Sequence, residues 1–165
     1  MKLFAFFLII ISTSSFAQNI IRVRATLIPN TGSFTATSEK AKGRLLKNGN
    51  TFTADRISVF VSSFRTENEL RDKHFAEHIG GGNKQTHPRI DITELKAENG
   101  EGQAKLTLNG VTKPVKIKYD DKKNHVEASF NVSSAEFNLP RAQYLGIGVE
   151  NDVAVNVKYF YEIKK

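Results

Sequence analysis

Apolar and polar residues alternate along most of the chain after its first 17 positions. Ile21, Val23 and Ala25 alternate with arginines, and the longest such series runs through residues 153–161. Each series places apolar groups on one face of a β-strand and polar groups on the other. The pattern predicts eight strands, the second of them with room for a bulge or a turn. They lie near residues 20–28, 32–46, 51–64, 88–96, 103–109, 114–120, 125–132 and 152–163.

Turn signals separate the strand segments. Asn-Gly occurs at Asn48-Gly49, Asn99-Gly100 and Asn109-Gly110. Asn-Gly between alternating segments is a strong hairpin signal, because both residues tolerate positive φ. Eight regularly spaced strands with tight turns indicate an all-β protein, either a sandwich or a barrel.

One segment, residues 67–80, breaks the strand pattern. Its apolar and histidine side chains recur three and four positions apart, which predicts one short helix. These side chains are Leu70, His74, Phe75, His78 and Ile79. Gly80-Gly81-Gly82 follows and is expected to end the helix. Residues 133–150 are predicted to form a long connection before the final strand, with a helical turn.

The first 17 residues have the pattern of a cleaved signal peptide. Lys2 gives a charged start, residues 3–11 are uniformly apolar, and Ser15-Phe16-Ala17 fits a small-x-small cleavage site. The apolar run is far shorter than the roughly 20 residues that span a bilayer. We therefore expect a signal peptide at residues 1–17, a single domain at residues 18–165, and a periplasmic or secreted product without cysteines.

Basic residues exceed acidic ones, and several lysines cluster. Without Lys2, 23 lysines and arginines face 17 acids, a net charge of +6. Lys105, Lys113, Lys116 and Lys118 surround one predicted hairpin. They form either a basic strip for transient contact with an anionic membrane surface or the solvated face and edge guards of a sheet. Basic residues are not interleaved with aromatics as in a nucleic-acid-binding module, and no pattern indicates an oligomeric state.

Residues 74–78 spell H-x-x-E-H, the motif of an inverted zinc-protease site. A zinc hydrolase using His74, Glu77 and His78 is therefore an alternative. However, a catalytic zinc needs a third protein ligand, which is not evident, and the glycines end the helix directly after His78. The structural interpretation is one core-facing and one exposed histidine. We expect no metal, no cofactor and no enzymatic activity.

Other candidate side chains have structural and binding interpretations. Arg71 and Asp72 could tie the helix to the rest of the fold by charge-assisted hydrogen bonds, or contact a ligand head group. Tyr119, Phe130 and Tyr159 lie on predicted inward faces. They either pack a core or line a tunnel, because an eight-stranded barrel has room for packed side chains or for one slender ligand.

Five motifs in order resemble those of the YceI-like family of secreted polyisoprenoid-binding proteins, over roughly residues 32–161. They are Thr66 with Asn68, Arg71, Asp72 and His74; His87-Pro88-Arg89-Ile90; Leu106-Thr107-Leu108; Gly110-Val111-Thr112-Lys113-Pro114-Val115; and Arg141 with Leu145-Gly146-Ile147 and Asp152-Val153. The resemblance implies an eight-stranded antiparallel lipocalin-like barrel in the periplasm. It also implies a long isoprenoid chain inside, quinone-like or prenyl-phosphate, and no catalysis.

The candidate ligand-binding residues of such a barrel are Arg71, Asp72, His74, Phe75, His78, Tyr119, Phe130 and Tyr159. Glycines replace an aromatic stretch of the family at residues 80–82, and we expect the helix with these glycines to act as a lid. The expected function is storage or transport of an isoprenoid lipid. The alternatives are an interaction or stress-response protein with a filled barrel, and the zinc hydrolase.

Overall fold

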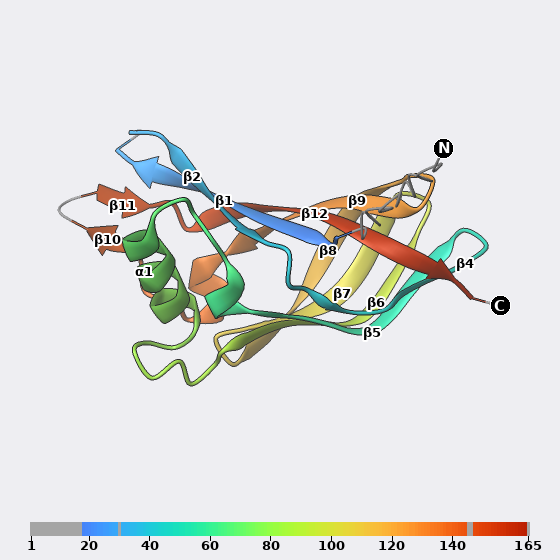
Figure 1. Cartoon of the computed structure of the whole chain (residues 1–165), viewed down its shortest axis with the longest axis horizontal. Coiled ribbons are helices and arrows are strands. Elements are labelled where there is room, and N and C mark those ends of the chain that lie inside the picture. Colours follow the sequence, from blue (N-terminus) through green and yellow to red (C-terminus); the bar gives the residue numbers. More distant parts are fainter. Residues whose placement is uncertain (1–17, 30, 145–146, 165) are drawn as a thin grey trace, which may run out of the picture.

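The computed structural model describes residues 18–29, 31–144 and 147–164, so the predicted signal peptide at residues 1–17 lies outside the described residues. Twelve strands are present in this part of the chain (Figure 1). They are β1 (Ile20–Ile28), β2 (Ser33–Ser38), β3 (Lys42–Gly43), β4 (Leu45–Asn48), β5 (Thr51–Phe60), β6 (Arg89–Glu98), β7 (Glu101–Leu108), β8 (Val111–Asp121), β9 (His125–Ser133), β10 (Gln143–Tyr144), β11 (Ile147–Val149) and β12 (Asp152–Ile163). The helices are η1 (Val61–Ser63), α1 (Glu69–Ile79) and η2 (Ser134–Phe137).

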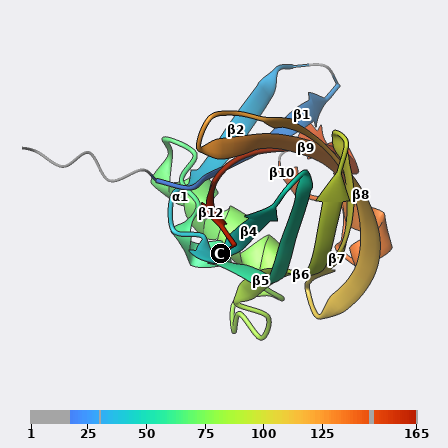
Figure 2. The same ribbon diagram turned by 90° about the vertical axis from the view of Figure 1, so that its right-hand side faces the viewer.

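Seven strands close into a barrel, which Figure 2 shows from one end. The order is β12-β4-β5-β6-β7-β8-β9, and β9 pairs with β12 to complete the ring. Neighbours are antiparallel except for β12 and β4, which are parallel. The predicted barrel is therefore confirmed, with a ring of seven strands instead of eight.

The predicted strand at residues 32–46 is divided, which accounts for the different count. Its first part, β2, pairs with β1, and β1 pairs with the middle of β12. Its last part, β4, pairs with the end of β12 beyond β1. Gly43 breaks the strand, because it has a φ of 137° and any Cβ there would collide with the carbonyl oxygen of Arg56 on β5.

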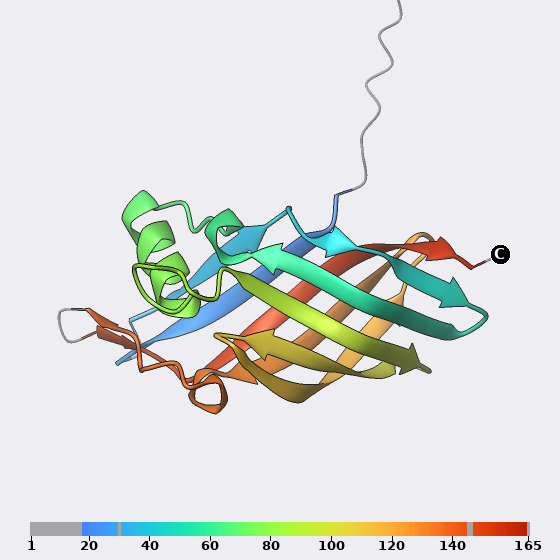
Figure 3. The ribbon, with the colours of Figure 1, turned by 90° about the horizontal axis from the view of Figure 1, so that it is seen from below.

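The predicted helix is α1, and it covers one end of the barrel (Figure 3). Asn68 caps its N-terminus by accepting a hydrogen bond from the backbone N–H of Arg71 at 2.9 Å. Past the helix end, Gly81 and Gly82 have φ values of 86° and 87°, which favour glycine. The predicted triglycine stop is thus confirmed. Across the described ranges, no helix is long and apolar enough to cross a membrane.

The predicted connection at residues 133–150 contains more order than expected. The helical turn is present as η2, but residues 143–149 also supply β10 and β11. β11 extends the sheet beside β1, where Leu27 pairs with Val149 and Ile28 with Gly148. Gly148 therefore belongs to a short β-strand pair at the α1 end of the barrel, whereas Pro140 precedes this pair in the connection.

Buried side chains form two separate clusters, one at each end of the barrel. The α1-end cluster contains Val23, Ala36, Val59, Phe64, Leu106, Leu108, Val132, Phe137, Leu139 and Val155. The β4-end cluster contains Leu45, Phe52, Ala54, Ala97, Val126 and Tyr159. Between the two clusters, inward-facing side chains are only partly buried, which indicates space along the barrel axis.

Candidate functional site

An apolar cavity of about 140 Å³ lies inside the barrel. Its lining consists of aliphatic and aromatic side chains alone, contributed by strands all around the ring and by α1. Phe75 and Ile79 border it at the α1 end, whereas Leu45 and Tyr159 border it at the β4 end. The cavity thus extends between the two buried clusters, with the geometry of a site for an apolar group.

Several lining residues are half-buried although they point inward, because they face this cavity and not a packed neighbour. They include Ile57, Ile92, Leu95, Ala128 and Val157. Strand alternation places Ala128 and Val157 on inward faces, but it marks none of the five as a site residue. Alternation identifies the inward face of a strand, and it does not indicate which inward side chains border empty space.

The volume limits what the site holds without rearrangement. An engineered apolar cavity of about 150 Å³ takes up benzene, whereas pockets for larger ligands occupy roughly 300–1,000 Å³. In this conformation the barrel accommodates a short apolar group. A longer chain requires lining side chains such as Phe130 or Phe75 to change rotamer, and thereby to enlarge the space.

The α1 end of the cavity is closed by aromatic packing and a polar tether. The ring of Phe75 on α1 lies 5.4 Å from that of Phe64, at an interplanar angle of 49°. One carboxylate oxygen of Asp72 accepts hydrogen bonds from the backbone N–H and the hydroxyl of Thr66, both at 2.7 Å. Arg65, in turn, forms a backbone bridge with Thr37. Asp72 therefore ties α1 to the barrel, as the structural interpretation predicted.

The other polar candidates on α1 lie outside the cavity lining. Arg71 is exposed, and its guanidinium carbon lies 5.0 Å from the centroid of the Phe34 ring, which is a cation–π contact. His74 is also exposed. His78 is half-buried, and this burial lowers its pKa. In the described part of the chain, no three histidine, aspartate or glutamate side chains are grouped to hold a metal ion.

The aromatic candidates divide into cavity-lining and packing residues. Phe130 and Tyr159, together with Phe75, line the cavity. The hydroxyl of Tyr159 donates to the carbonyl oxygen of Gly43 at 2.9 Å, and burial raises the pKa of Tyr159 to about 12. Tyr119 instead packs edge-on against Phe52, with ring centroids 5.3 Å apart. The binding roles of all these residues stay predictions.

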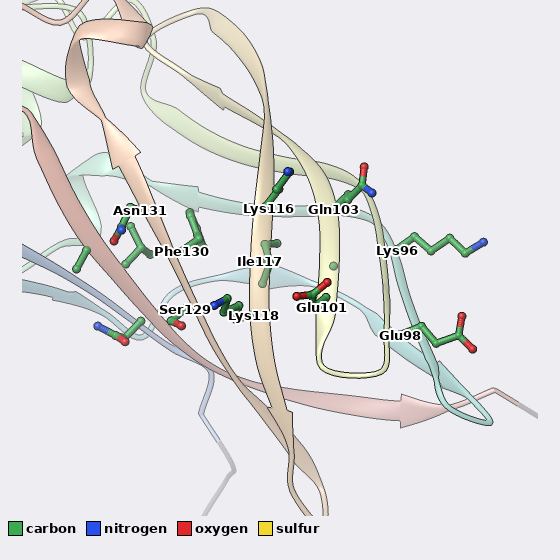
Figure 4. Close-up of a pocket in the computed structure, with 14 residues that line it drawn as sticks. Lys96, Glu98, Glu101, Gln103, Lys116, Ile117, Lys118, Ser129, Phe130 and Asn131 are labelled. Carbon is green, nitrogen blue, oxygen red and sulfur yellow. The ribbon is translucent and has the colours of Figure 1, made fainter.

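A second hollow, of about 700 Å³, lies on the outer face of β6, β7, β8, β9 and β12 (Figure 4). We call it the outer groove. Its rim is polar and charged, with Lys96, Glu98, Glu101, Gln103, Lys116, Lys118, Ser129, Asn131 and Asn156. Two lysines of the predicted basic strip thus lie in this groove. A third, Lys105, is paired with Glu94 at 2.8 Å.

Comparisons with known proteins agree with this architecture. The family description "YceI-like domain" matches residues 12–160. None of the curated proteins is detectably similar to the chain. Among solved structures, BcnA of Burkholderia cenocepacia superposes with a TM-score of 0.61 at 13% identity, covering 84% of this chain and 94% of BcnA. A polyisoprenoid binding domain from Saccharophagus degradans, implicated in plant cell wall breakdown, gives 0.63 at 11% identity, covering 87% and 93%.

Proposed function

Because this chain belongs to the YceI-like family, we propose that it is a non-enzymatic binding protein that stores or carries the chain of an isoprenoid lipid inside its barrel, after export to the periplasm. The observation that carries the proposal is the wholly apolar cavity along the barrel axis. Burial of apolar surface, at about 25 cal/mol per Å², supplies the binding free energy. The Saccharophagus degradans domain, described as polyisoprenoid-binding, supports this choice of ligand.

The polarity of the site constrains how such a lipid binds. Tyr159 carries the one hydroxyl among the lining residues, and it already donates to Gly43. A polar head group inside would therefore lose its hydrogen bonds with water without replacement, which is costly. We propose that the chain occupies the cavity, and that a quinone-like or prenyl-phosphate head stays outside it.

A second candidate function rests on the cavity volume. At about 140 Å³, the space is smaller than a long isoprenoid chain needs, and this favours an interaction or stress-response protein with a largely filled barrel. The lipid-binding proposal requires the barrel interior to widen when a ligand enters. The two candidates thus differ in a measurable quantity, the amount of apolar ligand that the purified protein holds.

Organic extraction of the protein purified from its native host, followed by mass spectrometry, tests the proposal. We expect one isoprenoid lipid per chain. Ala128→Leu should abolish this, because Ala128 lines the cavity and a larger side chain fills it. Ala135→Leu is the matched control, since Ala135 is exposed on η2. Absence of any lipid from the natural protein, together with unchanged melting on addition of isoprenoids, would favour the filled barrel.

A further inference from the structure

We infer that the gap between β8 and β9 is a lateral binding site for a single-chain amphiphile with an anionic head group. The head binds outside, at Lys116 and Asn131, and the apolar chain passes between the two strands into the cavity. The inference rests on the proposed function, because it needs a cavity that takes up an apolar chain. This lateral route differs from the expected route at the α1 end, where the helix and the following glycines were expected to act as a lid.

The ladder between β8 and β9 is incomplete. Pairing covers residues 118–121 of β8 and residues 126–129 of β9, and it stops at the pair Lys118–Ser129. β8 begins seven residues before this pair, at Val111, and β9 continues to Ser133. Figure 4 shows the two strands diverging from Lys118 and Ser129 toward Lys116 and Asn131. The backbone ladder of the barrel wall is therefore interrupted from Lys116 and Asn131 onward, and η2 packs against β8 farther along.

The sequence of β8 agrees with an open edge. Pro114 lies within the stretch of β8 that has no β9 partner. Proline lacks a backbone N–H, so within sheets it is confined to edge strands, to strand starts and to bulges. On its other side, Pro114 pairs with Lys105 of β7. The stretch is thus a local edge within a closed barrel, and the proline prevents full pairing there.

The outer groove and the inner cavity share part of their lining. Ile117, Phe130 and Val155 border both hollows. Phe130 and Val155 are cross-strand partners on β9 and β12, and Ile117 belongs to β8. These three side chains therefore form part of the wall between the groove and the cavity. Phe130 is half-buried, and a rotation of its ring would join the two spaces.

The rim of the gap suits an anionic head group. Continuing the β8–β9 register by two residues places Lys116 opposite Asn131, and both side chains are exposed. Within the described residues, Lys116 forms no ion pair, and its neighbour on β7 is the neutral Gln103. Lys118 differs, because it lies opposite Glu101. Lys116 therefore offers an unneutralised positive charge, with an amide donor across the gap.

A cleavable crosslink across the gap tests the route. The chain has no cysteine, so a bismaleimide that contains a disulfide can bridge K116C and N131C selectively. The control bridges K118C and S129C, which face each other where the strands already pair. The readout is the rate at which the neutral methyl ester of cis-parinaric acid enters the protein, seen as a rise in its fluorescence.

We expect the K116C–N131C bridge to slow uptake by about tenfold or more, as a gating step does when it limits exchange. Reduction of the linker should restore the rate, and the control bridge should leave it within about twofold. In addition, Phe130→Ala should accelerate uptake. Unchanged uptake after bridging, or equal slowing by both bridges, overturns the lateral route. No uptake by the unbridged protein overturns both this inference and the proposed function.

A second comparison tests the head-group site. Lys116→Gln should weaken binding of cis-parinaric acid by about threefold to fivefold, the size expected for one exposed charge contact. The same variant should bind the methyl ester unchanged. Lys113→Gln is the control, because Lys113 does not line the groove. If Lys116→Gln weakens binding of the acid and of the ester equally, the head-group site is overturned. The same holds if Lys116→Gln leaves the affinity for the acid unchanged but makes the protein self-associate, because Lys116 would then protect the edge of β8.

Discussion

Replacing Asp72 with alanine should destabilise the protein by loosening α1. The Asp72 carboxylate accepts two hydrogen bonds of 2.7 Å from Thr66, one from the backbone N–H and one from the hydroxyl. These two bonds link Thr66 to α1. Thr66 is 5% exposed, so water cannot easily replace the lost partner. The side chain of Asp72 is itself mostly shielded, at 16% exposure.

The expected loss follows from these contacts. A hydrogen bond to a charged group contributes about 1.5–3 kcal/mol, and the two bonds share one carboxylate, so we take about 3 kcal/mol for the pair. Arg65 adds little, because its Nε lies 3.9 Å from the carboxylate and its side chain is 66% exposed. For a chain of this size, each kcal/mol shifts Tm by roughly 2–4 °C. Asp72→Ala should therefore lower Tm by about 6–12 °C.

Differential scanning calorimetry of residues 18–165 measures this shift. Asp72→Asn keeps an acceptor oxygen without the charge, and it should lose about half as much. Asp120→Ala is the surface control, because that side chain is 77% exposed and its ion pair with Lys122 spans 3.8 Å. A shift below about 2 °C for Asp72→Ala would refute the tether. Intact stability with lost lipid binding would place Asp72 in the head-group site instead.

Three further predictions concern titration and the cavity. Burial lowers the pKa of His78 in the folded state, so the unfolded chain binds a proton more readily, and stability should fall as pH drops below about 6.5. His78→Gln should remove this acid-side loss, seen as a smaller difference in Tm between about pH 5 and 7.5. The pKa of Tyr159 is raised to about 12, so stability should fall as pH rises above the unfolded value of about 10. Tyr159→Phe should abolish that alkaline loss in urea titrations, while the lost bond to Gly43 costs about 1 kcal/mol at neutral pH. Ala128→Leu should keep or raise Tm while it excludes methyl parinarate, measured by fluorescence.

Each of these predictions has a result that contradicts it. A pH dependence of Tm that survives His78→Gln unchanged assigns the acid-side loss to other groups. The same holds at alkaline pH if Tyr159→Phe leaves the profile as it was. A large fall in Tm for Ala128→Leu would mean that the space beside Ala128 is too tightly packed to accept a larger side chain.

Much of the fold was predictable because local patterns and tertiary structure agree. Alternation and Asn-Gly turns located most strands of the ring, and the spacing of Leu70, His74 and His78 with the following glycines located α1. A bulge or turn in the second strand was anticipated, but its position was not predictable, because it depends on how close Gly43 comes to β5. The hairpin at residues 143–149 was missed for a similar reason, since β11 owes its order to pairing with β1.

The candidate site was predictable only in part. Phe130 and Tyr159 were selected as inward strand aromatics and line the cavity, as does Phe75 of the predicted helix. Tyr119, selected by the same strand rule, packs against Phe52. Periodicity does not separate these cases, because the difference depends on the distance between opposite walls. The open edge of β8 did leave a signal in the sequence, namely Pro114 within an otherwise alternating strand.

The position of β12 in the ring has a consequence for folding. This strand pairs with β9 on one side and with β1 and β4 on the other. Strands from the two ends of the domain must therefore meet before the barrel closes, which makes the closing contacts distant in sequence and folding slow. While the chain is being synthesised, the edges of β9, β1 and β4 that pair with β12 stay unpaired until β12 emerges. During this interval those unpaired edges expose the nascent protein to aggregation by strand pairing with other chains.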